Sequence, residues 1–262
     1  MLQFTANLSL LFTELDLIDR FKAAKESGFN AVEIQFPYSI PAEQIKDILD
    51  QQQLKLVLFN IDADDLLQGG EGLAAVPEKR QQFSDAIQQC KAYAEILKPE
   101  AINVLPGRCQ LNPERKKEYL SCFTDNLSLA VETFAPLAIK TVFEAINTED
   151  MPRFIVSTGQ QMLDILEQIN HPQLFMQYDI YHMHKMREDI APFIRNHCDK
   201  IGHIQFADNP GRGQPGTGSI NFEPIFDAIA QSSYAGWVGA EYNPQGSSKQ
   251  SLDWLTTDKS SR

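Results

Sequence analysis

The sequence predicts an α/β fold with a single (β/α)8 TIM barrel as its architecture. Strand-like and helix-like segments alternate along the whole chain, and no linker-like change of composition divides it. The length of 262 residues suits a barrel of roughly 250 residues, so we expect one domain over residues 1–262. A doubly wound open sheet is the main alternative. It would normally use fewer strands and carry a glycine-rich turn after the first one, which this chain lacks.

The first half of the chain contains four predicted strands, each a short apolar run bounded by polar or turn residues. Gly28 is typical of a helix stop, and Pro41 suits the first position of the next helix. Residues 61–77 lack periodicity and are predicted as a long loop, a kind that is usually functional or disordered. The predicted strands are 4–8, 31–35, 54–60 and 101–105, and the predicted helices are 13–27, 41–53, 79–97 and 113–134.

The second half continues the alternation, and two of its apolar runs end in polar residues. The run before Asp179 and the run before Asp208 are each followed by side chains that carry oxygen or nitrogen. The predicted strands are 141–144, 174–179, 201–206 and 237–242, and the predicted helices are 158–169, 189–197, 222–231 and 248–255. Residues 256–262 are expected to form a frayed tail.

The composition argues against nucleic-acid and membrane partners. The chain has 23 basic and 35 acidic residues, a net charge of −12, and would be repelled by phosphate backbones and anionic lipids. No run approaches the roughly 20 apolar residues of a membrane span, and the first residues do not resemble a signal peptide. The four cysteines show no paired spacing and are expected to be free thiols. We therefore expect a cytoplasmic protein, and the sequence leaves a homo-oligomer open.

Polar side chains end several predicted strands, at the edge where a barrel of this kind has its active site. The acids Glu144, Asp179 and Glu241 end three strands, and the amide of Gln205 ends a fourth. Unpaired buried carboxylates would be costly, and a bound divalent cation would offset that cost. An all-oxygen set of this kind suits Mg²⁺ or Mn²⁺. For a single acid, a solvated rim position or a helix cap is the more common explanation, but it explains three acids on three strands poorly.

Four further residues are candidates for binding substrate. His182, expected in the loop after the sixth strand, could contact substrate oxygens or pack as a neutral residue, and the two readings are about even. Arg212 lies in a glycine-rich loop and suits an anionic group, although a plain surface arginine is the default reading. Asn7 and Glu33 end the first two strands, and Glu33 could equally turn outward toward a lysine. No nucleophile elbow or P-loop is present, and the glycine-rich loop matches a dinucleotide fingerprint poorly.

These residues lie in longer stretches through which the sequence resembles the hydroxypyruvate isomerase family, within the xylose-isomerase-like TIM barrels. The stretches span nearly the whole chain, and the two blocks around residues 177–183 and 200–218 are long and specific to this branch. The matching stretches are FTANLS (4–9), GFNAVEIQFPY (28–38), EAIN (144–147), QYDIYHM (177–183), KIGHIQFADNPGRGQPGTG (200–218) and GWVGAEY (236–242).

The resemblance implies a role for each residue of the candidate site. Glu144 and Glu241 match the two glutamates that act as proton donor and acceptor and also bind the metal. Asp179 and Gln205 match the other two metal positions, and related sugar 3-epimerases carry histidine in place of this glutamine. His182 and Arg212 match positions that contact substrate in those epimerases. Two departures stand out: residues 69–72 read GGEG where relatives commonly have GERG, and Ala145 replaces a common proline.

The implied reaction is the isomerisation of hydroxypyruvate, a small anionic hydroxy-carbonyl compound, to tartronate semialdehyde through an enediolate. Isomerisation of 2-oxo-tetronate, one carbon longer, is the nearest alternative. A free-sugar epimerase is disfavoured by Gln205 and by the anion-binding arginine. From other classes, a non-catalytic barrel that binds a metal or a sugar acid would not need two opposed glutamates, and a metal-dependent endonuclease would want more histidines and a basic surface.

Overall fold

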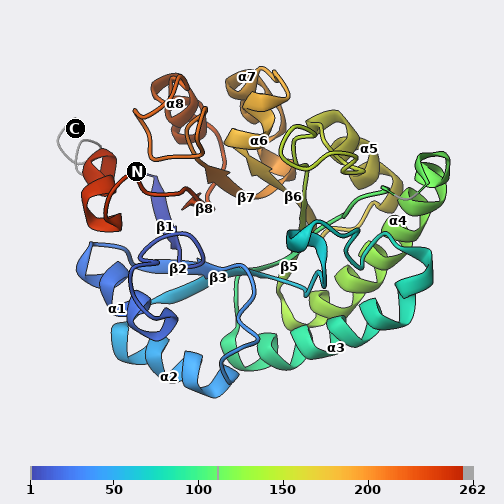
Figure 1. The fold of residues 1–262 in the computed structure, drawn as a ribbon, viewed down its shortest axis with the longest axis horizontal. Helices are drawn as coiled ribbons and strands as arrows, with labels where there is room; N and C mark the ends of the chain where they lie inside the picture. The colour runs from blue at the N-terminus through green and yellow to red at the C-terminus, as the bar shows by residue number, and fades with distance from the viewer. Residues whose placement is uncertain (1, 111, 256–262) are drawn as a thin grey trace.

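The computed structural model describes residues 2–110 and 112–255, and it confirms the predicted TIM barrel. The strands of the described chain close in sequence order from β1 to β8, and every neighbouring pair is parallel. Figure 1 shows the helices packed around the outside of these strands. The strands are β1 Gln3–Asn7, β2 Ala31–Ile34, β3 Lys55–Asn60, β4 Ala101–Val104, β5 Lys140–Glu144, β6 Leu174–Asp179, β7 Ile201–Phe206 and β8 Trp237–Ala240.

The helices follow the strands in the order that the sequence predicts. The α-helices are α1 Leu17–Glu26, α2 Ala42–Gln52, α3 Arg80–Leu97, α4 Lys116–Phe134, α5 Gly159–Ile169, α6 Ile180–Lys185, α7 Ile190–His197 and α8 Glu223–Gln231. Short 3-10 segments are η1 Leu66–Gln68, η2 Pro77–Lys79, η3 Pro113–Arg115, η4 Ala135–Leu137, η5 Cys198–Lys200 and η6 Ser248–Leu252. None of the helices in the described residues is long and apolar enough to cross a membrane.

Several predicted bounds differ from the structure: the strand predicted at 237–242 ends at Ala240, and the helix predicted at 113–134 opens as the 3-10 segment η3. The first helix begins at Leu17 rather than residue 13, because residues 13–15 form turns before the Asp16 N-cap. The predicted final helix opens as the 3-10 segment η6, and Ser247 caps it. The segment after β6 is the helix α6 rather than a loop, because the Asp179 carboxylate accepts hydrogen bonds from the backbone N–H groups at its start. The expected frayed tail, 256–262, lies outside the described residues.

The barrel interior has an apolar lower layer and a polar upper layer. Ala31, Ala101 and Val142 belong to a small buried cluster that is separate from the main core between strands and helices. Each lies two residues before a polar strand residue, and side chains two apart on a strand share one face. These polar residues therefore lie inside the barrel above the apolar layer, toward the C-terminal strand ends. They are Glu33, Asn103 and Glu144.

The long loop after β3 is packed rather than open. Glu71 is buried, and its carboxylate accepts a hydrogen bond from the backbone N–H of Gln110 (2.6 Å) and another from the Tyr119 hydroxyl (2.8 Å). The backbone oxygen of Glu71 also accepts from the Arg108 N–H at 3.0 Å. This loop is thereby tied to the loop after β4, and it carries η1 to the mouth of the barrel.

Candidate active site

Three carboxylates and one amide meet at the C-terminal ends of four neighbouring strands. They are Glu144 at the end of β5, Asp179 at the end of β6, Gln205 within β7 and Glu241 directly after β8. All four side chains are buried. The parallel register brings these ends to one level, since Asp179 pairs with Gln205 across β6 and β7. The four residues predicted from the sequence as metal ligands therefore occupy one site.

A small cavity of about 50 Å³ opens at this site. Its polar lining includes Glu144, Gln205 and Glu241, together with side chains from the loops above the strands. The other lining residues are Asn7, Gln35, Phe36, Leu58, Asn60, Leu67, Leu105, Ile146, Met151, Gln177, His182 and Arg212. The lining thus combines polar groups with apolar side chains, as in most small-molecule sites.

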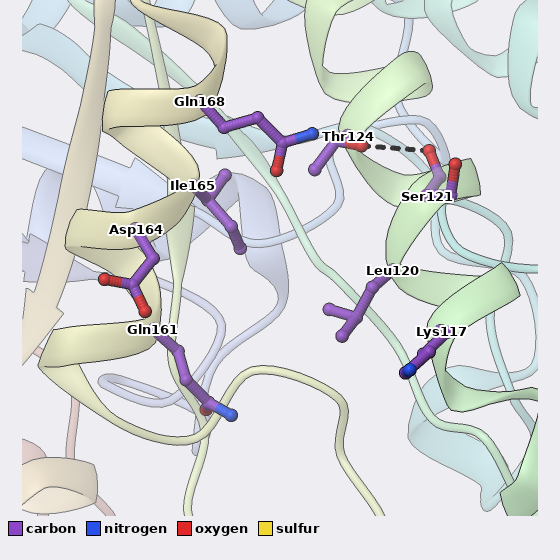
Figure 2. A pocket seen from close by; sticks show the side chains of 8 residues that line it. All are labelled: Lys117, Leu120, Ser121, Thr124, Gln161, Asp164, Ile165 and Gln168. Carbon is purple, nitrogen blue, oxygen red and sulfur yellow. Dashed lines mark hydrogen bonds between the residues drawn. The ribbon is translucent and has the colours of Figure 1, made fainter.

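A larger groove lies between α4 and α5, and its volume is about 460 Å³. Figure 2 shows Leu120 and Ile165 at its centre, with Lys117 and Asp164 among the polar side chains around them. These side chains belong to two outer helices, and none of the strand-end acids is among the residues that line the groove. We therefore place the candidate active site at the barrel mouth rather than in this groove.

Glu144 is held by two amide side chains from neighbouring strands. Its Oε1 accepts from Nδ2 of Asn103 at 3.1 Å, and its Oε2 accepts from Nε2 of Gln177 at 2.9 Å. Burial raises the pKa of Glu144 to about 8, and the nearby charges of Glu241 and Asp179 act in the same direction. A carboxyl group with a pKa in this range can both take up and release a proton near neutral pH.

Glu241 has both a cationic partner and neutral partners. Its Oε2 lies 2.5 Å from Nη2 of Arg212, and its Oε1 accepts from the side-chain amides of Asn7 (2.9 Å) and Gln35 (3.0 Å). Burial raises the pKa of Glu241 to about 7, and the Arg212 charge opposes this rise. Asn7, predicted to bind substrate, therefore lines the cavity and contacts one of the proposed proton-transfer groups.

Only one of the two carboxylate oxygens of Asp179 accepts hydrogen bonds from the described residues. Its Oδ1 accepts from the backbone N–H groups of Tyr181 (2.7 Å) and His182 (3.4 Å), which caps α6. Its Oδ2 is buried without a hydrogen-bond partner among the described residues and lies 3.7 Å from Nε2 of His182 and 3.9 Å from Nη2 of Arg212. A buried carboxylate oxygen without a donor is a place where a cation would be stabilising.

His182 is held as a neutral imidazole of defined tautomer. Nδ2 of Asn147 lies 2.7 Å from its Nδ1, and the other amide atom of Asn147 accepts from two backbone N–H groups, at Glu149 and Asp150. The amide must therefore donate to Nδ1, which leaves the ring proton on Nε2. Burial lowers the pKa of His182 to about 4. The histidine can thus offer an Nε2–H donor to a ligand in the cavity.

The glycine-rich loop after β7 presents Arg212, and Asp208 organises that loop. The buried Asp208 carboxylate accepts from four backbone N–H groups at 2.8–3.0 Å, those of Asn209, Gly216, Gly218 and Ile220. Arg212 has a left-handed backbone conformation (φ 52°). Its guanidinium stacks over the Tyr181 ring at 5.3 Å and remains 27% exposed. The loop therefore brings a positive charge to the mouth of the cavity.

Gln177 belongs to the site although the sequence analysis did not select it. Its Nε2 donates to Oε2 of Glu144 (2.9 Å) and to Oε1 of Gln205 (2.7 Å), so one amide group joins two of the candidate ligands. Gln177 precedes Asp179 by two residues on β6, and the alternation of side chains along a strand therefore put it on the same face. That alternation was the signal that could have identified it.

Glu33, also predicted to bind substrate, lies inside the barrel and is fully buried. It accepts hydrogen bonds from the side chains of Asn7, His203 and Gln205. It is not among the residues that line the cavity. The open alternative, an outward turn toward a lysine, is wrong, because the carboxylate faces β1 and β7.

The donor set fits a hard divalent cation, because it consists of three carboxylates and an amide oxygen and includes the unpartnered Oδ2 of Asp179. As the side chains stand, no three acidic, histidine or cysteine residues in the described part of the chain are gathered closely enough to hold an ion. The Arg212 guanidinium instead supplies the positive charge beside Glu241 and Asp179. Binding of an ion would therefore require these side chains to rearrange.

Comparisons with known proteins agree with this architecture. The family model of the xylose isomerase-like TIM barrel matches residues 21–257. Hydroxypyruvate isomerase of Escherichia coli is 37% identical over 97% of this chain and 98% of that protein. 2-oxo-tetronate isomerase of Pectobacterium atrosepticum is 35% identical over 96% of both. A crystal structure described as AP endonuclease, family 2, from Brucella melitensis has a TM-score of 0.93 and 32% identity, covering 98% of this chain and 99% of that one.

Proposed function

This chain belongs to the hydroxypyruvate isomerase family of xylose isomerase-like TIM barrels, and from that premise we propose that it interconverts hydroxypyruvate and tartronate semialdehyde. It is a sugar-acid isomerase, as its curated relatives are. The observation that carries the finer proposal is the meeting of two buried glutamates, Glu144 and Glu241, with one arginine, Arg212, at a small cavity.

In the proposed reaction one glutamate removes a proton from C3 of hydroxypyruvate. The electron pair of the C–H bond forms a C2=C3 double bond while the carbonyl π pair moves onto O2, which gives an enediolate. The other glutamate, which starts protonated, then delivers its proton to C2. The O3 hydroxyl proton passes to O2, so that C3 becomes the aldehyde and C2 carries the hydroxyl. The raised pKa of Glu144 suits this role, since its carboxyl group can exchange protons near pH 7.

Two further side chains would bind the substrate. The Arg212 guanidinium would leave Glu241 and pair with the substrate carboxylate in a charge-assisted hydrogen bond. The Nε2–H of His182 would donate to the oxygens at C2 and C3, where negative charge develops as the enediolate forms. The apolar side chains of Leu67, Leu105 and Met151 would exclude water from the reacting carbons.

Glu144, Asp179, Gln205 and Glu241 would hold Mg²⁺ or Mn²⁺ at this site. When bound, such an ion polarises the carbonyl, increases the acidity of the neighbouring C–H and neutralises the charge of the enediolate. The three carboxylates would then share a divalent charge in place of the single charge of Arg212. This arrangement frees the guanidinium for the substrate carboxylate.

Isomerisation of 2-oxo-tetronate is the second candidate. A 2-oxo-tetronate isomerase is 35% identical to this chain, close to the 37% of the hydroxypyruvate isomerase. The loop at residues 69–72 has no arginine, and Leu67, half-exposed in the same loop, lines the cavity. A nucleic-acid substrate, as the name AP endonuclease implies for the Brucella protein, is disfavoured by the net charge of −12.

The proposal is tested by incubating the purified protein with Mg²⁺ and either hydroxypyruvate, 2-oxo-tetronate or D-fructose, and following the products by proton NMR. We expect the highest kcat/KM with hydroxypyruvate and no turnover of the uncharged sugar. A higher kcat/KM with 2-oxo-tetronate would establish the second candidate. Turnover of fructose alone would contradict both.

A further inference from the structure

Glu33 is enclosed in the barrel by side chains that donate hydrogen bonds to it. Its Oε1 accepts from Nε2 of Gln205 at 2.7 Å and from Nδ2 of Asn7 at 3.1 Å. Its Oε2 lies 2.7 Å from Nε2 of His203. Glu33 is 0% exposed, and His203 and Gln205 share a face of β7 two residues apart. The carboxylate therefore lies beneath the candidate metal site and in contact with one of its members.

An ionised carboxylate can only accept hydrogen bonds, and this fixes the amide of Gln205. The nitrogen of that amide must face Glu33, so Oε1 is on the opposite side, where it accepts from Nε2 of Gln177 at 2.7 Å. Gln205 itself lines the cavity. With the amide turned over, its oxygen would face the Glu33 carboxylate and its NH₂ group would face the cavity, where it would repel a cation.

The barrel makes room for this contact with a glycine. Gly239 on β8 pairs with Gln205 across the sheet. A Cβ atom at Gly239 would lie 2.6 Å from Oε2 and 2.8 Å from Oε1 of Glu33, closer than real Cβ contacts allow. A side chain at this position would therefore push the Glu33 carboxylate away from Gln205.

We propose that Glu33 is a positioning residue that turns the Gln205 amide so that its oxygen faces a bound divalent cation. The inference rests on the proposed metal site, and it gives Glu33 a role through Gln205 in place of the direct substrate contact expected from the sequence. Partners that orient a metal ligand typically contribute 10- to 100-fold to metal affinity, and we expect loss of the Glu33 acceptors to weaken binding by about that factor.

The test measures the affinity for Mn²⁺ alone, by the EPR signal of the free ion, in wild type and in four variants. Glu33→Leu removes the acceptors at similar volume, and we expect it to weaken binding roughly 10- to 100-fold. Glu33→Gln should retain wild-type affinity, because its oxygen can accept from Gln205 and Asn7 while its NH₂ donates to His203. In a Gln205→Ala background, Glu33→Leu should cause no further loss of Mn²⁺ affinity, because Glu33 acts on the ion only through Gln205.

Other results would overturn the role of Glu33 or the metal site itself. If the losses from Glu33→Leu and Gln205→Ala add, or if Glu33→Gln is as weak as Glu33→Leu, Glu33 does not act through the amide and the inference is overturned. Wild-type protein that binds no Mn²⁺ overturns the metal site and this role together. If Glu33→Leu does not fold, Gly239→Ala displaces the carboxylate without removing it, and its loss must likewise vanish in the Gln205→Ala background.

Discussion

Nη2 of Arg212 lies 2.5 Å from Oε2 of Glu241, so the positive charge at the site is paired with a proposed proton-transfer group. The same nitrogen is 3.9 Å from the buried Oδ2 of Asp179. The arginine thus compensates two acids that the strands bring together. We propose that it turns from them toward a substrate carboxylate, which would link substrate binding to the charge state of the site.

Arg212→Met tests the proposed substrate contact. Loss of hydrogen bonds to a charged group is worth about 1.5–3 kcal/mol, so we expect KM for hydroxypyruvate to rise roughly 10- to 100-fold while kcat changes less. Steady-state kinetics measure both constants. Arg195→Met, an exposed change on α7, is the matched control. A variant at Arg212 with unchanged KM would exclude this residue as the anion contact.

Glu144→Gln and Glu241→Gln test the two proton-transfer roles. Each change keeps the shape of the side chain but removes its ability to exchange a proton, and we expect kcat to fall about 10²- to 10⁴-fold. The readout is the rate of product formation, with Glu132→Gln on the exposed face of α4 as the control. Full turnover by either active-site variant would remove that glutamate from the mechanism.

The raised pKa of Glu144 predicts a pH-dependent stability of the protein without divalent cation. The folded state holds the Glu144 proton more tightly than the unfolded chain does, so this group stabilises the fold below about pH 4.5. That contribution is lost as the pH rises toward 8. We expect the free energy of unfolding, measured with urea, to fall between pH 5 and 8 and to fall less in Glu144→Gln. Equal slopes in the two proteins would show that Glu144 is not the responsible group.

Asp208→Asn tests how the loop presents Arg212. The change places an NH₂ group against backbone N–H donors that now meet a carboxylate, so we expect the loop to loosen. Trypsin should then cleave after Arg212 faster than in wild type, and KM should rise. Asp227→Asn on the exposed face of α8 is the control. Unchanged cleavage together with unchanged KM would mean that Asp208 does not hold the arginine.

Much of the site could be predicted because strand ends in a closed parallel barrel meet at one edge. An acid that follows an apolar run, such as Glu144 or Asp179, is visible in the sequence, and the barrel brings such residues together. The six-residue helix α6 was missed because it is too short for a periodic pattern. Its start depends on the cap made by Asp179, whose position at a strand end predicted a metal ligand more strongly than a helix cap.

The supporting hydrogen bonds could not be predicted in the same way. The contacts of Gln177 with Glu144, and of Asn147 with His182, join residues 33 and 35 positions apart, and their donors have no distinctive spacing. The direction in which Glu33 faces depends on which side of β2 turns inward, and the apolar neighbours on both sides leave that open. These contacts follow from the closed sheet rather than from any local pattern.

Removal and return of the divalent cation tests the central claim, metal-assisted isomerisation at Glu144 and Glu241, most directly. Wild-type protein is dialysed against EDTA, and its kcat with hydroxypyruvate is measured before and after addition of Mg²⁺ or Mn²⁺. We predict that dialysis lowers kcat at least about 100-fold and that either ion restores it. Full turnover of hydroxypyruvate by the dialysed protein, with excess EDTA present throughout the assay, would contradict the account.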